Sequence, residues 1–282
     1  MPNTTDLRLA VLIDADNAPH TQLTPIMEEI AVHGTPTIKR IYGDWTGPYV
    51  TGWKNKLLEH AITPVQQYAY TQGKNATDSA MIIDAMDILY SERVDGFCIV
   101  SSDSDFTRLA TRLREAGMKV IGIGERKTPA PFIAACDKFT YIEIIRANQP
   151  AAKLAVAPRP KASKAAKNIA APSIEETTKN GKVKKEVAEP TTPTPIVAPA
   201  PHLTRSVIDV LAATIEDVAD DDGWAFLGKV GHLIMRKQPS FDPRNFGYQS
   251  LTKLIQAVDD FEIDFRNHTH ESGSKLIYVR IK

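Results

Sequence analysis

The sequence predicts an α/β protein with a doubly wound parallel sheet, followed by a disordered linker and a small winged-helix domain. Three observations predict this organisation. Short apolar strands alternate with amphipathic helices from Arg8 to about Arg146, the composition changes abruptly at residues 147–200, and ordered patterning resumes after residue 200. Strands that alternate with helices are typical of a parallel sheet covered on both faces. We therefore expect domains at 1–146 and 201–282, joined by a linker at 147–200.

The first region opens with the continuous apolar run 9–13, which is typical of a strand buried on both faces. Apolar periodicity predicts a helix from Pro19 through Ile30 and a stronger one at 78–90. Gly117 is expected to end the helix at 106–115. Further strands are predicted at 37–42, 62–67, 96–100 and 119–123, and a short helix at 53–60.

Residues 147–200 are rich in Ala, Pro, Lys and Thr and nearly lack large apolar side chains. Such a segment cannot bury enough surface to offset the entropy of ordering, so we predict a disordered tether. The third region again has helical apolar spacing, from Val207 to Ile215, at 230–235 and at 250–257. Two alternating strands follow at 261–265 and 275–280, with a turn near Ser272. Three short helices and a terminal hairpin predict a winged-helix module.

Charge and cysteine content exclude several classes of protein. The 34 basic and 34 acidic residues cancel, so no global field attracts nucleic acid. The two cysteines, Cys98 and Cys136, lie in apolar contexts without metal-ligand spacing, which favours a reducing cytoplasm over a disulfide scaffold. The sequence shows neither a signal segment nor an apolar run of membrane-spanning length, so we expect a cytoplasmic protein without a membrane partner.

Acidic residues stand after two predicted strands and at the start of one predicted helix. Asp14 follows the first strand, Asp103 and Asp105 follow the strand that ends at Val100, and Asp78 opens the long helix. Because the carboxyl ends of parallel strands line one crevice, we expect these carboxylates to converge. Each one alone also fits helix capping or the helix dipole. Together they favour a site for Mg²⁺ or Mn²⁺ and metal-assisted hydrolysis of a phosphodiester.

Three further residues are candidates for contacts with a phosphate or with a ligand carboxylate. Asn17 follows the first acidic pair, Lys74 lies in a Gly-Lys-Asn stretch before the long helix, and Arg108 lies in the helix after Asp105. A close backbone approach with a nearby cation suits a phosphate. Asp84 and Asp87 lie further along the long helix, away from the face that carries Asp78, so we expect structural roles for them.

With these residues in view, residues 1–146 resemble an NYN domain of the PIN-like ribonuclease superfamily. The resemblance rests on the stretches 13–17, 73–78 and 100–106. It implies an acidic metal site at Asp14, Asp78 and Asp103, with Asp105 as a further acid. Residues 201–282 resemble an OST-HTH (LOTUS) domain through the stretches 222–225, 239–241 and 246–248. That resemblance implies binding to RNA, including structured G-rich RNA, or to a protein partner.

The resulting hypothesis is a metal-dependent ribonuclease with a C-terminal module that captures single-stranded or structured G-rich RNA. A binding adaptor without catalysis is the first alternative, since PIN-like domains are not all active. An aspartyl phosphatase is the second, because Asp14-Ala15-Asp16 has the Asp-x-Asp form, although Ala18 stands where that chemistry normally has Thr or Val. A topoisomerase-primase-like site would use Asp103 and Asp105 but needs a Glu where Asp14 stands. The pattern does not predict the oligomeric state.

Overall fold

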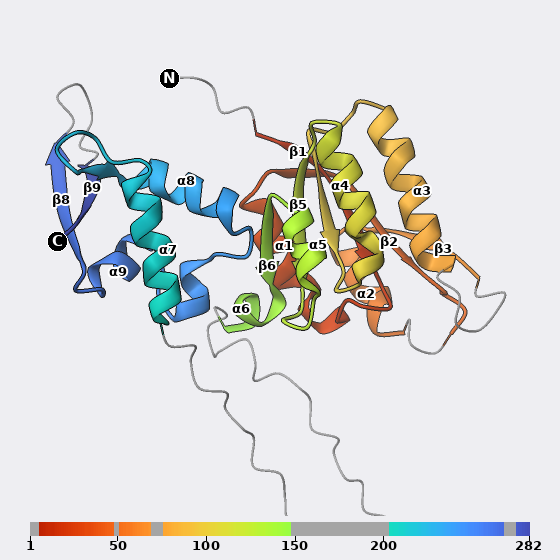
Figure 1. The fold of residues 1–282 in the computed structure, drawn as a ribbon. Coiled ribbons are helices and arrows are strands. Elements are labelled where there is room, and N and C mark those ends of the chain that lie inside the picture. The colour runs from red at the N-terminus through yellow and green to blue at the C-terminus, as the bar shows by residue number, and fades with distance from the viewer. Residues whose placement is uncertain (1–5, 48–50, 69–75, 148–202, 268–274) are drawn as a thin grey trace, which may run out of the picture. The chain divides into compact units, whose positions relative to one another are not determined.

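The computed structural model describes residues 6–47, 51–68, 76–147, 203–267 and 275–282 (Figure 1). The N-terminal region contains a six-stranded parallel sheet in the order β3-β2-β1-β4-β5-β6. From β1 the chain winds outward through β2 to β3, and then from β4 outward through β5 to β6. The predicted doubly wound sheet is therefore confirmed, and its direction switches between β1 and β4. The strands are β1 Arg8–Asp14, β2 Thr35–Gly43, β3 Thr63–Gln66, β4 Gly96–Val100, β5 Lys119–Gly124 and β6 Lys138–Tyr141.

Helices cover both faces of this sheet, and alternate residues of β1 separate the two resulting cores. Ala10 and Leu12 pack with α3 (Ala76–Tyr90), α4 (Thr107–Glu115) and α5 (Ala130–Ala135). Leu9, Val11 and Ile13 pack with α1 (Leu23–Ala31), α2 (Thr51–Glu59) and α6 (Ile142–Ala147). This two-sided burial explains why β1 has no polar residue between Arg8 and Asp14. Two short 3-10 helices, η1 (His20–Gln22) and η3 (Ser104–Phe106), precede α1 and α4.

The predicted strands and helices of this region all occur, with ends displaced by a few residues. Sequence periodicity missed α5, β6 and α6, because each is only four to six residues long and too short for a repeating pattern. They are held by packing instead: Phe132 and Phe139 are fully buried and meet edge to face. β6 thereby completes one edge of the sheet.

The C-terminal region has the predicted three helices and hairpin, with one short strand in addition. Its elements are α7 Arg205–Glu216, β7 Ala225–Phe226, α8 Leu227–Lys237, η5 Pro243–Phe246, α9 Leu251–Gln256, β8 Phe261–Asn267 and β9 Lys275–Ile281. The strands form an antiparallel sheet in the order β7-β9-β8. Leu211, Val230, Leu254 and Val279 are fully buried in its core. The predicted turn near Ser272 and the predicted linker, apart from Ala147, lie outside the described residues.

The described residues of the N-terminal and C-terminal regions, which fall within Met1–Gln149 and Ala200–Lys282, cluster into one compact unit. Within the part of the chain that the structure describes, no helix has both the length and the apolar character needed to cross a membrane.

Candidate metal centre

The acidic residues stand around the point where the sheet changes direction. Asp14 is the last residue of β1, and the segment from Ser101 to Asp105 follows the neighbouring strand β4. Asp78 lies in the first turn of α3. Because β1 and β4 are parallel neighbours, their carboxyl ends open at the same edge of the sheet, where ligands of such folds bind. The fold therefore brings residues from three separate stretches of sequence to one place.

Asp78, Asp103 and Asp105 form the tightest group. One carboxylate oxygen from each lies within 4.8 Å of the other two. Asp78 and Asp103 are partly buried, whereas Asp105 is exposed. Asp103 caps η3, and its Oδ1 accepts a hydrogen bond of 2.9 Å from the backbone N–H of Asp105. This bond fixes the backbone that connects two members of the group.

Asp14 lies beside this group and is not part of it. Its side chain is buried, with 1% of the residue exposed, and both oxygens accept hydrogen bonds. The backbone N–H of Asp16 donates to Oδ1 at 3.0 Å, while Asn17 Nδ2 and Ser101 Oγ donate to Oδ2 at 2.7 and 2.8 Å. A carboxylate held by three donors has a fixed orientation, which suits either a ligand or a fixed negative charge behind the ligands.

Ser101 is the residue of this site that sequence reasoning did not single out. Its hydroxyl donates to Asp14 and accepts a bond of 3.1 Å from the backbone N–H of Asp103. It therefore connects the end of β1 to the loop after β4. The only available signal was a polar residue directly after an apolar strand, and that signal is also typical of an ordinary turn. Its neighbour Ser102 accepts from the backbone N–H of Glu125 and supports the loop after β5.

Burial, together with the charge of neighbouring carboxylates, raises the pKa values at this edge. Burial is the main cause for Asp78, and the charges of Asp14, Asp103, Asp105 and Asp16 add to it, which together raise its pKa to about 6. Burial also raises the pKa of Asp14, against the three hydrogen bonds that favour its charged form. A cation bound beside such a carboxyl would stabilise its deprotonated form and would offset the repulsion between the neighbouring carboxylates.

Of the other predicted residues, Asn17 and Arg108 are described. Asn17 contacts Asp14, as noted above, and so orients a carboxylate. Arg108 is exposed in the first turn of α4, three residues after Asp105. Lys74 lies outside the described residues. The structural role expected for Asp84 is present, because Arg40 and the Tyr42 hydroxyl both donate to its carboxylate.

The donor set fits a hard divalent cation. All three members of the group offer carboxylate oxygens, which are the ligands that Mg²⁺ and Mn²⁺ prefer. Two oxygens on one Mg²⁺ lie at most about 4.2 Å apart, because each is about 2.1 Å from the ion. The observed separations, within 4.8 Å, are therefore close to those of ligation.

Comparison with known families identifies both folded regions. The model of the NYN domain matches residues 8–143, and the model of the OST-HTH/LOTUS domain matches residues 200–272. The NYN match spans the whole sheet and every acidic residue of the candidate site. The second match spans the C-terminal region from α7 to β8.

Individual relatives resemble only parts of the chain. The "Uncharacterized protein MJ0482" of Methanocaldococcus jannaschii is 29% identical over 121 residues, which is 42% of this chain and 47% of that protein. The chain thus spans about half the length of this relative. A solved protein of unknown function from Vibrio parahaemolyticus, VPA0982, is 20% identical with a TM-score of 0.43, over 50% of this chain and 96% of that one. An uncharacterized Nitrosomonas europaea protein, NE0665, is 32% identical with a TM-score of 0.27, over 34% of this chain and 92% of that one.

Proposed function

The chain contains an NYN domain of the PIN-like nuclease superfamily and an OST-HTH/LOTUS domain, and we propose that it is a divalent-metal-dependent ribonuclease. The observation that carries this proposal is the group formed by Asp78, Asp103 and Asp105 at the carboxyl edge of the parallel sheet. The family match alone would support a nuclease-like fold. The convergent carboxylates support a metal site at which a phosphodiester bond could be hydrolysed.

In this proposal Asp78, Asp103 and Asp105 hold Mg²⁺ or Mn²⁺, and Asp14 supplies a fourth carboxylate beside them. A divalent ion bound there would supply an activated water and neutralise charge on the scissile phosphate. The chain's own residues supply orientation. Ser101 and Asn17 keep Asp14 in place through hydrogen bonds of 2.8 and 2.7 Å.

Two cations are proposed to contact the substrate phosphates. Arg108 is exposed in the first turn of α4, close in sequence to Asp105, and its guanidinium suits a bidentate phosphate contact. Lys74 precedes α3, the helix that carries Asp78, and its role remains a prediction from the sequence. A contact to the phosphate backbone would position RNA without selecting its sequence.

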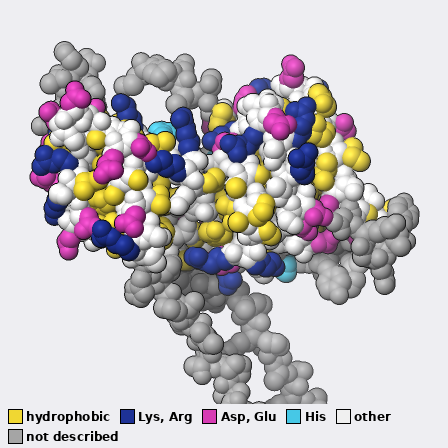
Figure 2. Space-filling model, viewed as in Figure 1, with side chains coloured by type: hydrophobic (Ala, Val, Ile, Leu, Met, Phe, Trp, Pro, Cys, Tyr) yellow, Lys and Arg dark blue, Asp and Glu magenta, His cyan; other side chains and the backbone are white. Residues whose placement is uncertain are grey.

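The OST-HTH/LOTUS domain supports RNA binding as the task of the C-terminal region. We propose single-stranded or structured G-rich RNA as its ligand, and a protein partner as the second candidate. On the face drawn in Figure 2, basic and acidic side chains are interspersed instead of gathered by sign. Binding would then depend on local contacts more than on a broad positive field, and its salt dependence would be modest.

The direct test is cleavage of a labelled single-stranded RNA pool by the full chain with Mg²⁺ or Mn²⁺, beside an EDTA control. Asp103→Asn removes one charge from the acidic group, and we expect it to abolish cleavage while leaving RNA affinity unchanged. Asp87→Asn is the matched control, because Asp87 is an exposed acid on α3, the helix of Asp78. This variant should cleave like the unmodified chain.

Two results would contradict the proposal. Cleavage that survives both EDTA and Asp103→Asn would show that the acidic group does not carry the reaction. RNA binding without any cleavage, mapped to residues 203–282, would favour the non-catalytic adaptor instead. The aspartyl phosphatase alternative would require a covalent phosphate on Asp14, whose two oxygens are already occupied by three hydrogen bonds.

A further inference from the structure

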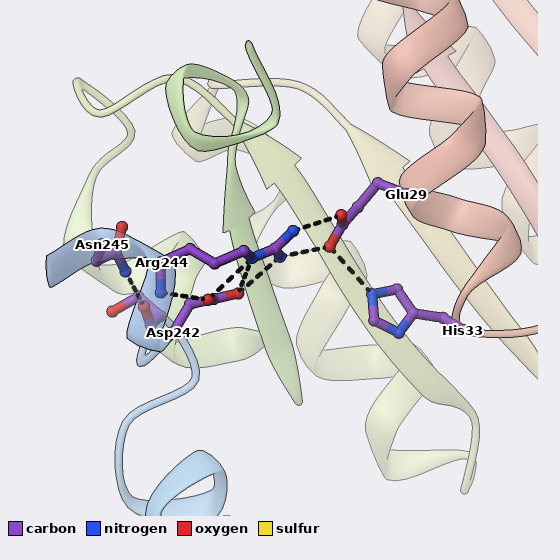
Figure 3. A network of polar contacts seen from close by, with 6 residues as sticks. Glu29, His33, Asp242, Arg244 and Asn245 are labelled. Carbon is purple, nitrogen blue, oxygen red and sulfur yellow. Dashed lines mark hydrogen bonds and ion pairs between the residues drawn. The ribbon is translucent and has the colours of Figure 1, made fainter. Parts of the chain in front are cut away.

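Arg244, in the C-terminal region, forms an ion pair with Glu29 of the NYN domain. Its Nη1 and Nη2 donate to the two Glu29 oxygens at 2.9 and 2.7 Å, a bidentate arrangement (Figure 3). The Glu29 side chain is only 10% exposed and that of Arg244 23%. Bidentate pairs between Arg and a carboxylate are among the stronger and more geometrically specific polar contacts. The pair joins residues 215 positions apart in the sequence.

Arg244 is also held in position by Asp242, two residues earlier in the same region. Asp242 caps η5 by accepting from the backbone N–H of Arg244, and its carboxylate also accepts from Arg244 Nε at 3.0 Å and Nη2 at 2.7 Å. Asp242 is itself buried, with 7% of the residue exposed. The guanidinium is therefore oriented by the C-terminal region alone, so little additional ordering is needed to bind Glu29.

Glu29 is poorly placed for the stability of its own helix. It lies in the last turn of α1, where the helix dipole disfavours negative charge. Burial would raise the pKa of Glu29, but the hydrogen bonds from Arg244, the nearby His33 ring with Nε2 at 3.7 Å from Glu29 Oε1, and the charge of Arg244 hold it well below its usual range. The ionised Glu29 is thus stabilised by Arg244, a partner outside the NYN domain, in addition to the neighbouring His33.

A second contact occurs at the free edge of the parallel sheet. β6 is an edge strand, and the backbone N–H of Phe139 donates to the carbonyl of Pro239 at 2.8 Å. Next to it, Lys138 has a pKa lowered by burial, while Asp242 and Glu29 oppose this shift. Exposed edge strands invite pairing with other chains, and covering one with another segment is a common protection. The Pro239 carbonyl covers part of this edge.

From these contacts we propose that the OST-HTH/LOTUS domain binds the NYN domain of the same chain on its α1–β6 side. The ion pair between Arg244 and Glu29 fixes this arrangement. The docking surface includes Glu29, His33, Lys138 and Phe139 on one side and Pro239, Asp242 and Arg244 on the other. α1 runs back from the carboxyl edge of the sheet, and Glu29 lies in its last turn. The contact therefore lies toward the opposite end of the strands from Asp14. The proposal goes beyond the nuclease assignment and does not depend on catalysis.

The experiment measures rotational tumbling of the full chain by backbone ¹⁵N relaxation. We expect the two domains of the unmodified chain to tumble with one correlation time. In Arg244→Ala the C-terminal amides should tumble faster than those of the parallel sheet. Glu29→Gln changes the other partner of the pair and should have the same effect. Arg205→Ala is the matched control, because the Arg205 side chain is 73% exposed and pairs with Asp209 and Asp260 of its own domain.

Hydrogen exchange supplies a second readout at a single amide. The Phe139 N–H should be protected in the unmodified chain and in Arg205→Ala, and should exchange at least about tenfold faster in Arg244→Ala. The Ile123 N–H, on the interior strand β5, should stay protected throughout and shows that the sheet remains folded.

Three outcomes would overturn the proposal. The first is independent tumbling of the domains in the unmodified chain. The second is unchanged tumbling and Phe139 protection in both Arg244→Ala and Glu29→Gln. The third is a dimer of the unmodified chain, measured by light scattering, that becomes a monomer in Arg244→Ala. That result would assign the contact to two copies of the chain. Because none of these readouts uses RNA cleavage, a failed nuclease assay would not affect them.

Discussion

Ser101 and Asp14, 87 residues apart in the sequence, are joined by a hydrogen bond of 2.8 Å between the Ser101 hydroxyl and Asp14 Oδ2. Both residues are 1% exposed. The same hydroxyl accepts from the backbone N–H of Asp103. One serine therefore holds together the ends of the two strands between which the sheet changes direction.

Ser101→Ala should weaken divalent-metal affinity by about 10- to 100-fold, the usual cost of losing a group that orients ligands. The substitution removes the bond to Asp14 and the acceptor for Asp103 while keeping a small side chain. Isothermal titration calorimetry with Mn²⁺ measures the change in affinity. Ser104→Ala is the control, because the Ser104 side chain is exposed in η3. Equal affinities in the two variants would contradict the orienting role.

Two substitutions of Asp14 should have different effects on stability. Asp14→Ala leaves three donors, from Asp16, Asn17 and Ser101, without their acceptor, so we expect a loss of about 1–3 kcal/mol in the free energy of unfolding. Asp14→Asn keeps one acceptor oxygen for some of these donors and removes a buried charge, so it should lose less stability than Asp14→Ala at pH 7.5. Chemical denaturation without metal compares them. A larger loss in the Asn variant would contradict this account.

The pKa of Asp78, raised to about 6, predicts opposite effects of pH with and without metal. A carboxyl whose folded pKa is above its unfolded value binds more protons in the folded state. Its contribution to stability is therefore present at low pH and is lost as pH rises through about 6. Metal binding needs the deprotonated form, so it grows over the same range.

Thermal unfolding measures both effects. We expect Mn²⁺ to raise the melting temperature at pH 7.5 and to have little effect at pH 5. Without metal, Asp78→Asn should lose less stability than the unmodified chain between pH 5 and pH 7.5. A metal-induced rise of equal size at both pH values would show that Asp78 is not a ligand.

Asp84 should contribute to stability without contributing to the metal site. Its carboxylate accepts from Arg40 and from the hydroxyl of Tyr42, a residue with no exposed surface. Asp84→Ala leaves the buried hydroxyl without its acceptor and should cost about 1–3 kcal/mol in the free energy of unfolding. Asp87→Ala, at an exposed position of the same helix, should change it by less than about 0.5 kcal/mol. Mn²⁺ affinity should be unchanged in both variants.

Much of the fold was predictable because its signals are local. The apolar run of β1 and the periodicity of α3 each lie within one segment, so the alternation of strands and helices follows from the sequence. The short elements α5, β6 and α6 were missed for the converse reason. Phe132 and Phe139 are buried by contacts with other segments, and four to six residues are too few for a periodic pattern.

The candidate site was predictable as a set of residue types but not as a geometry. Placing acids after strands of a parallel sheet predicts that they converge, and Asp78, Asp103 and Asp105 do so. The prediction did not separate these three from Asp14, which is buried behind hydrogen bonds to Ser101 and Asn17. Which acids face a ligand depends on side-chain packing at the strand ends, and sequence spacing does not contain that information.

Sequence patterning alone was therefore enough for the fold class, the two folded regions and the acidic residues, because periodicity and composition act within single segments. Tertiary structure decided the rest. It decided that Ser101 joins two strand ends, and it decided that Glu29 pairs with Arg244 across 215 residues of sequence. Contacts of this kind form only when distant segments pack against one another, so no local pattern specifies them in advance.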